Sequence, residues 1–107
     1  MAEKPYRGVR RSVATNVGTT GHKVFSSGTV KGESGPRSGL YLSNNHASQK
    51  VYVFLANAGA DAPTMAAAGA NYTLAAGGAV ELEVNEFVDV YVLGSGASTD
   101  YAAVEMV

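Results

Sequence analysis

The sequence predicts one all-β domain, a single β-sandwich or small barrel of about seven or eight short antiparallel strands. Three observations support this fold class. Apolar and polar residues alternate with a period of two in several short segments. Glycine occurs 13 times and often separates those segments, and no segment carries the apolar spacing of an amphipathic helix. A chain of 107 residues has the usual length of one domain with one core.

In the first half of the chain, strands are expected at residues 9–17 and 23–30, with a glycine-containing turn between them. A third strand is expected at residues 37–45. Leu40 and Leu42 share one face of this segment, which ends at a pair of asparagines, a turn signal. One side of this strand is therefore expected to face the core.

Residues 50–56 form the most apolar segment, and its side chains are apolar on both faces of the expected strand. Such a strand lies at the centre of a sheet, or its outer face meets another chain. The segment is therefore our candidate for a subunit interface, through Val51, Tyr52, Val53, Phe54 and Leu55.

Residues 57–71 are rich in alanine and interrupted by glycine and proline, which predicts a loop with at most one helical turn. Residues 72–74 and 80–84 are then expected to form a hairpin around Gly77 and Gly78. The alternation in the second strand directs apolar side chains to the core and acidic ones to solvent, namely Val80, Leu82 and Val84 against Glu81 and Glu83.

The last two strands are expected at residues 87–93 and 101–107. Asp89 shares one face of the first with Phe87, Tyr91 and Leu93. The carboxylate is either paired with a base or located at a wet position on a half-exposed face, and the pattern favours the wet position. On the last strand, Ala102, Val104 and Met106 alternate against Tyr101, Ala103 and Glu105.

Residues 1–12 contain four basic side chains and little apolar periodicity, so we expect an extended N-terminal arm ahead of a sandwich domain over residues 13–107. The basic side chains that could contact a capsid or a neighbouring copy are Lys4, Arg7, Arg10 and Arg11. The segment has no apolar core of the kind that a signal peptide needs, and synthesis in a cytoplasm is expected.

Charge is divided unevenly along the chain. Residues 1–50 hold eight basic and two acidic residues, whereas residues 51–107 hold seven acidic and no basic residues. The asymmetry indicates complementary subunit surfaces, a basic arm that reaches an acidic partner, or strands from the two halves that interleave and neutralise each other within one fold. The net charge of −1 and the lack of a basic stripe argue against nucleic acid as the main ligand.

Patterns typical of catalysis or cofactor binding are missing from the sequence. There is no cysteine, and the spacing of His22 and His46 does not predict a metal site. Ser43 and Ser48 lie near His46, but neighbours on one turn rarely assemble a nucleophile and its base. No glycine-rich phosphate-binding motif occurs. We expect no enzymatic activity, no cofactor and no metal, and the longest apolar run is too short to span a membrane.

Five segments follow one another in a characteristic order: RSGLYLSNN (37–45), VYV (51–53), LAAGGAVEL (74–82), VYVLGSG (90–96) and the Val-Glu pair at 104–105. Together they resemble small virion proteins of tailed bacteriophages. The resemblance covers about two-thirds of the chain, and it leaves residues 1–36 and the alanine-rich loop unexplained. It implies a β-sandwich that forms oligomers and binds a capsid shell through loops or a terminal arm, without catalytic residues.

The resemblance therefore implies a virion location and a structural function, most specifically a capsid decoration or cement protein with the major capsid protein, or another virion protein, as partner. A head–tail, tail or fibre-associated subunit is the alternative within the same class. A carbohydrate- or receptor-binding sandwich module is the alternative from another class, but the chain has no Trp to form a sugar platform. A small hydrolase or isomerase is the least favoured class.

Overall fold

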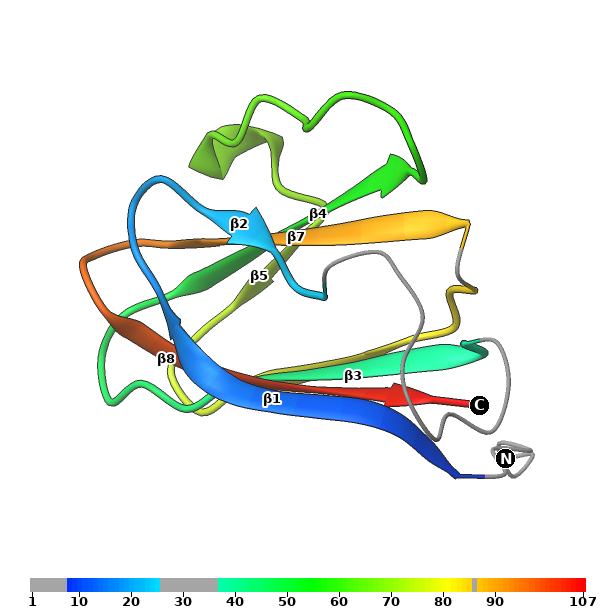
Figure 1. Cartoon of the computed structure of the whole chain (residues 1–107). Coiled ribbons are helices and arrows are strands. Elements are labelled where there is room, and N and C mark those ends of the chain that lie inside the picture. The colour runs from blue at the N-terminus through cyan, green and yellow to red at the C-terminus, as the bar shows by residue number, and fades with distance from the viewer. Residues whose placement is uncertain (1–7, 26–36, 86) are drawn as a thin grey trace.

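Two antiparallel four-stranded sheets packed face to face make up the fold (Figure 1). The computed structural model describes residues 8–25, 37–85 and 87–107. One sheet has the order β1-β8-β3-β6 and the other the order β2-β7-β4-β5. The prediction of an all-β sandwich is confirmed. The strands are β1 (Val9–Val17), β2 (His22–Lys23), β3 (Gly39–Asn44), β4 (Val51–Asn57), β5 (Tyr72–Leu74), β6 (Ala79–Leu82), β7 (Val88–Gly94) and β8 (Thr99–Met106).

The strand order is that of a jelly roll. β1 pairs with β8, β2 with β7, β3 with β6 and β4 with β5, so the second half of the chain pairs with the first half in reverse order. The two further pairs, β3 with β8 and β4 with β7, join these ribbons into the two sheets. Eight antiparallel strands wound in this way define a double-sheet jelly roll. In the β1-β8-β3-β6 sheet, strands from the basic half (residues 1–50) therefore alternate with strands from the acidic half (residues 51–107).

Alternating residues from both sheets fill the core between them. Leu40, Val51, Val53, Val92 and Ala103 are completely buried. Their strands place every second side chain inward, as expected for a pleated strand with a period of two. The inward face of the last strand is the one formed by Tyr101, Ala103 and Glu105.

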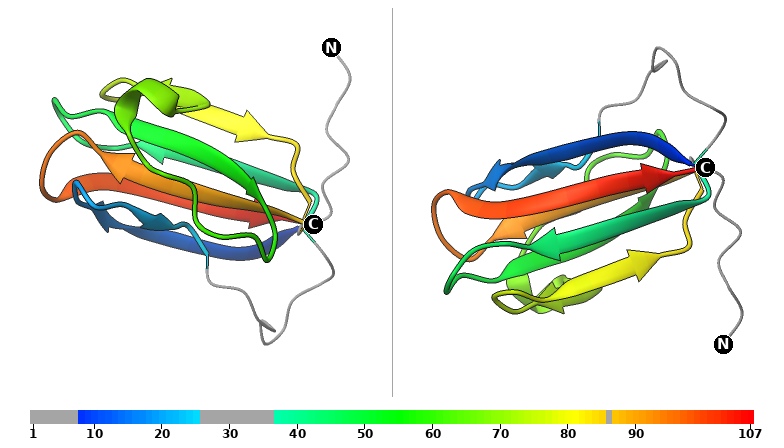
Figure 2. Two further views of the ribbon diagram at one scale, coloured as in Figure 1. Left: turned by 90° about the horizontal axis from the view of Figure 1, so that it is seen from above. Right: turned by 90° about the horizontal axis from the view of Figure 1, so that it is seen from below.

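The outer face of the β2-β7-β4-β5 sheet carries a second apolar cluster. Phe54, Tyr91 and Leu93 are buried there, and Met65 and Ala70 pack against them. Met65 and Ala70 belong to the loop between β4 and β5, which contains the short 3-10 helix η1 (Ala67–Gly69) and lies over this sheet (Figures 1 and 2). The expectation of a loop with one helical turn is confirmed, and this loop covers the sheet face from within the same chain.

The predicted hairpin at residues 72–84 is wrong in its pairing. β5 pairs with β4 in one sheet and β6 pairs with β3 in the other, so the glycine turn between them crosses from sheet to sheet. Gly77 has a φ of 76°, as a tight turn requires. The facing of the second strand is as predicted, because Leu82 is buried while Glu81 and Glu83 are exposed.

Of the predicted strand at residues 23–30, the structure describes residues 23–25, of which Lys23 belongs to β2 (His22–Lys23). Residues 26–30 lie outside the described part of the chain. In the described ranges, no helix is long and apolar enough to cross a membrane.

Candidate functional site

A buried cluster of charges lies where β1, β3 and β8 meet. Glu105 is 1% exposed and faces inward from β8. Its carboxylate accepts a hydrogen bond from Arg11 Nε and lies 3.5 Å from Arg10 Nη1 and 3.2 Å from Arg37 Nη1. The guanidinium of Arg11 also stacks over the ring of Phe25, 4.8 Å from its centroid. One acidic side chain from the second half of the chain therefore binds three basic side chains from the first half.

Arg37 connects this cluster to the opposite sheet. It is 7% exposed, and its guanidinium donates to the backbone carbonyls of Asn85 and of Val88, the first residue of β7. Burial lowers the pKa of Arg37, and the nearby carboxylates of Glu105 and Asp89 oppose that shift. Because five donors on a rigid fork can satisfy several acceptors at once, Arg37 ties β8 to the segment between β6 and β7.

Asp89 is paired with a base, the alternative that the sequence pattern did not favour. Its carboxylate lies 3.4 Å from Lys23 Nζ. The Lys23 ammonium also lies 5.9 Å from the centroid of the Tyr91 ring. The pairs of Glu105 with its three arginines and of Asp89 with Lys23 each join a base of residues 1–50 to an acid of residues 51–107. These pairs neutralise part of the charge asymmetry between the two halves of the chain inside the fold.

The two histidines have separate structural roles. His22 Nε2 lies 2.7 Å from the Tyr101 hydroxyl, in a hydrogen bond that joins β2 to β8 across the two sheets. Burial lowers the pKa of His22 and raises the pKa of Tyr101 to about 12. His46 Nδ1 accepts hydrogen bonds from the backbone N–H groups of Ser48 and Gln49. In the residues that the structure describes, no three His, Asp or Glu side chains group as metal ligands.

Around His46, buried Asn44 organises the turn that precedes β4. Its side-chain amide donates to the carbonyls of Gln49 and Leu74, and its oxygen accepts from His46 N. The contact of Ser48 with His46 is made by its backbone N–H, and neither the Ser43 nor the Ser48 hydroxyl is hydrogen-bonded to the His46 ring. This end of the molecule is a set of hydrogen-bonded turns, in which the His46 ring accepts hydrogen bonds from backbone N–H groups.

The outer face of the β1-β8-β3-β6 sheet carries two rows of mostly small or polar side chains. In one cross-strand row, Ser12, Val104, Tyr41 and Glu81 lie side by side, and in the next row Ala14, Ala102, Ser43 and Ala79 do so. Tyr41, 43% exposed, is the largest of these side chains. Seen from below, this sheet faces the viewer and no described segment crosses it (Figure 2). The outer face of the other sheet differs, because the loop with η1 covers it.

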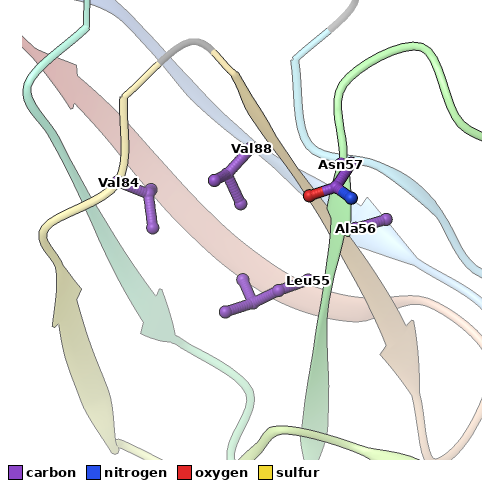
Figure 3. A pocket seen from close by; sticks show the side chains of 5 residues that line it. All are labelled: Leu55, Ala56, Asn57, Val84 and Val88. Carbon is purple, nitrogen blue, oxygen red and sulfur yellow. The ribbon is translucent and has the colours of Figure 1, made fainter.

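An open hollow of about 370 Å³ lies beside the ends of β4 and β6. Leu55, Val84 and Val88 surround it with apolar side chains, and Ala56 and Asn57 complete the lining (Figure 3). β5 pairs only with Val51–Val53, so the rest of β4 has no β5 partner along this edge.

Phe87 is the neighbour in sequence of Val88, which lines this hollow. The carbonyl of Phe87 accepts a hydrogen bond from Ala58 N, the residue after Asn57. Its own N–H donates to Asn85 Oδ1 at 2.9 Å. Phe87 is 68% exposed, the largest value of any bulky apolar side chain in the described ranges.

Of the predicted partner-binding residues, the structure describes Arg10 and Arg11. Arg10 and Arg11 belong to β1 and bind Glu105, so the part of the predicted arm from Val9 to Ser12 is strand and the boundary at residue 12 is moved to the N-terminal side. This strand forms because β8 offers it a pairing partner and a buried carboxylate. Lys4 and Arg7 lie outside the described residues.

The predicted subunit-interface strand is mostly interior. Val51 and Val53 are completely buried in the core, and Phe54 is covered by the chain's own loop. Tyr52 and Leu55 are half-buried, and Leu55 lines the hollow. Sequence reasoning missed Glu105 as the central buried charge. The available signal was its position on the same strand face as Tyr101 and Ala103, where an acidic residue needs a basic partner.

No protein-family model, curated protein or solved structure gives a significant match to this chain.

Proposed function

We propose that the chain is a structural virion protein, most specifically a capsid decoration or cement protein that binds the head shell and neighbouring copies. The observation that carries the proposal is a jelly roll with one outer sheet face covered by the chain's own loop and the other crossed by no described segment. Jelly rolls occur in viral capsid proteins and also in lectin and cupin domains. Because a fold hosts many functions, the chemistry of the exposed face has to narrow the choice.

The exposed face suits a protein partner. Small side chains such as Ala14, Ala102 and Ser43 let another protein layer approach the sheet closely, as in sheet-on-sheet packing with layers about 10 Å apart. Tyr41 adds a large side chain with a polar tip, a residue type enriched at interfaces. On a symmetric shell, many simultaneous contacts make a modest affinity per contact sufficient.

The basic N-terminal residues contribute to capsid binding in this proposal. With Arg10 and Arg11 bound to Glu105, Lys4 and Arg7 are the basic arm residues that would contact an acidic shell surface. Exposed ion pairs contribute about 0–1 kcal/mol each. Their contribution is therefore to orientation and association rate more than to affinity.

The test is a binding experiment with capsids of the phage that encodes the chain. Purified chain is mixed with capsids that lack it, particles are sedimented, and copies per particle are counted by quantitative mass spectrometry. Saturable binding at a copy number that matches a symmetry class of the shell is expected. If the wild-type chain does not sediment with the particles at saturating concentration, the proposed function is wrong.

Two charge variants locate the contact. Ala14→Arg places a cation on the exposed face of β1, and Thr73→Arg, a matched control, places the same cation at an exposed position of β5 in the other sheet. Ala14→Arg is expected to lower capsid affinity at least about tenfold, since a charge buried without a partner costs more than 1.4 kcal/mol. Equal binding by both variants excludes the β1-β8-β3-β6 face as the contact.

A glycan-binding module is the second candidate, and the exposed rings of Tyr41 and Tyr72 favour it. The two tyrosines belong to different sheets, on β3 and β5, so they do not form one sugar platform. Saturable quenching or enhancement of tyrosine fluorescence by a glycan, with no capsid binding, would select this function instead.

A further inference from the structure

We infer that the partner on the outer face of the β1-β8-β3-β6 sheet is a protein surface that presents lysine or arginine side chains opposite Glu81 and Asp100. The inference rests on the proposed function, which places a partner on this face, and adds the chemistry of that partner. Three properties of the sheet support it: the sign of the charges on its outer face, the burial of its basic side chains, and the uncharged area between the acids.

Acidic side chains lie at the margin of this outer face. Successive side chains of a strand point to opposite sides of the sheet. Because Leu82 and Tyr101 are buried in the core, their neighbours Glu81 and Asp100 point outward, and both are exposed. Glu81 lies on the edge strand β6, and Asp100 is the second residue of β8, opposite Asn16. The two carboxylates therefore lie on different strands and border the face.

The basic side chains of the same sheet are bound to a buried carboxylate. Arg10 and Arg11 are the two basic residues of β1, and both bind Glu105, which faces inward from β8. The other three strands of the sheet, over the bounds that the structure describes, contain no lysine or arginine. The charges that these strands present on the outer face are therefore negative.

The area between the two carboxylates is uncharged. Ala14, Ala102 and Ser43 lie side by side across three strands, and Val104 and Tyr41 form part of the neighbouring row. Protein interfaces have the same arrangement, with few charges at the centre and a polar rim that stays in contact with water. Charges in the rim set the orientation and the association rate of a partner of opposite sign.

The sign of these charges selects among the possible occupants of the face. Nucleic acid is negatively charged and would be repelled. A second copy that stacks through the same face is disfavoured for the same reason, because a two-fold interface places two identical acidic patches against each other. A basic protein surface attracts both carboxylates and can still pack on the uncharged centre. This surface differs from the acidic one that Lys4 and Arg7 need, so the two contacts lie at different places on the shell.

Charge reversal tests the sign of the partner, with capsids that lack the chain as the probe. Glu81→Lys is expected to lower capsid affinity at least about tenfold, because like charges would then face each other. Asp61→Lys is the matched control: it makes the same change in net charge in the exposed loop between β4 and β5, and a change below about threefold is expected. Equal or tighter binding by Glu81→Lys, while the wild-type chain binds, overturns the inference and leaves the proposed function intact.

Neutral variants provide a second measurement with less risk to the fold. Glu81→Gln and Asp100→Asn are each expected to lower capsid affinity about two- to fivefold, as loss of one exposed ion pair does, and tighter binding by both would indicate an acidic partner and overturn the inference. Circular dichroism verifies that each variant is folded.

Two further outcomes separate the alternatives. A wild-type chain that does not sediment with capsids overturns the proposed function and the inference with it. A wild-type chain that dimerises without capsids, through contacts that Ala14→Arg abolishes, shows that a second copy occupies the face and overturns the inference alone.

Discussion

Replacement of Glu105 by Gln is expected to destabilise the fold more than any other acid-to-amide change in the described residues. Gln has the shape of Glu and keeps some hydrogen bonds, but it removes the charge that compensates Arg10, Arg11 and Arg37. Breaking a buried ion pair by removing one partner costs about 3–5 kcal/mol. Arg11 is 23% exposed and can turn toward solvent, whereas Arg37 at 7% cannot, which places the expected loss near the lower figure.

A loss of about 3 kcal/mol is a large part of the 5–15 kcal/mol that holds a typical domain folded. Urea unfolding followed by circular dichroism at pH 7 measures it, and the melting temperature is expected to fall by roughly 10–20 °C. The control is Glu81→Gln on the exposed face of β6, with a change within about 0.5 kcal/mol. Adding Arg37→Met to Glu105→Gln is expected to cost less than the two single changes together, because the uncompensated buried cation is gone.

A loss below about 1 kcal/mol for Glu105→Gln, equal to that of Glu81→Gln, refutes this reasoning. It would mean that the three guanidinium groups are solvated well enough to need no buried partner. High salt provides a second check. Since buried pairs are screened much less than exposed ones, the difference between the two variants is expected to persist at about 1 M salt.

Gly94→Ala is expected to lower the free energy of unfolding by about 1–3 kcal/mol, because the added Cβ would lie 2.6 Å from both Thr99 Oγ1 and Val17 O. Gly18→Ala is the control and is expected to be near neutral, because a Cβ there has no atom within 4 Å. Urea unfolding midpoints compare the two variants. Stability is expected to fall as pH rises from about 10 to about 12, because the raised pKa of Tyr101 keeps the phenol protonated in the folded state while it ionises in the unfolded state. Unfolding measured as a function of pH checks this, and Tyr101→Phe is expected to remove the fall. Stability is expected to fall also as pH drops below about 6.5, because the lowered pKa of His22 disfavours the charged ring in the folded state, and an unchanged acid limb in His22→Phe would contradict this. Met65→Ser is expected to uncover the Phe54 cluster and speed proteolysis within residues 58–71, whereas Thr64→Ser, an exposed neighbour, is not.

The period-two pattern predicted most of the strands and many of the side chains that face the core, because a strand with one face in the core imposes that pattern on its sequence. The burial of Leu40 with Leu42, and the strand at 9–17, follow from it directly. Pairing between strands does not follow, since alternation indicates which side faces in but not which neighbour is bound. A Gly-Gly turn that crosses between sheets has the same local sequence as a hairpin turn, and the error at residues 72–84 arises there.

The surfaces were harder to predict than the strands. An apolar outer face on β4 is consistent with either a partner chain or the chain's own loop, and only the path of residues 58–71 decides that Met65 covers Phe54. The basic residues at 10 and 11 read as part of an arm because their partner, Glu105, is 94 residues away in the sequence. Long-range pairs of this kind leave no local pattern.

The proposed binding of this chain to a phage capsid is tested most directly by a cryo-electron microscopy reconstruction of the particle. Density for this jelly roll is expected on the outside of the head, oriented so that Tyr41 and Ala14 contact the shell and the loop with η1 points away from it. A particle whose head carries no such density, or one in which the β1-β8-β3-β6 face is turned to solvent, would contradict it.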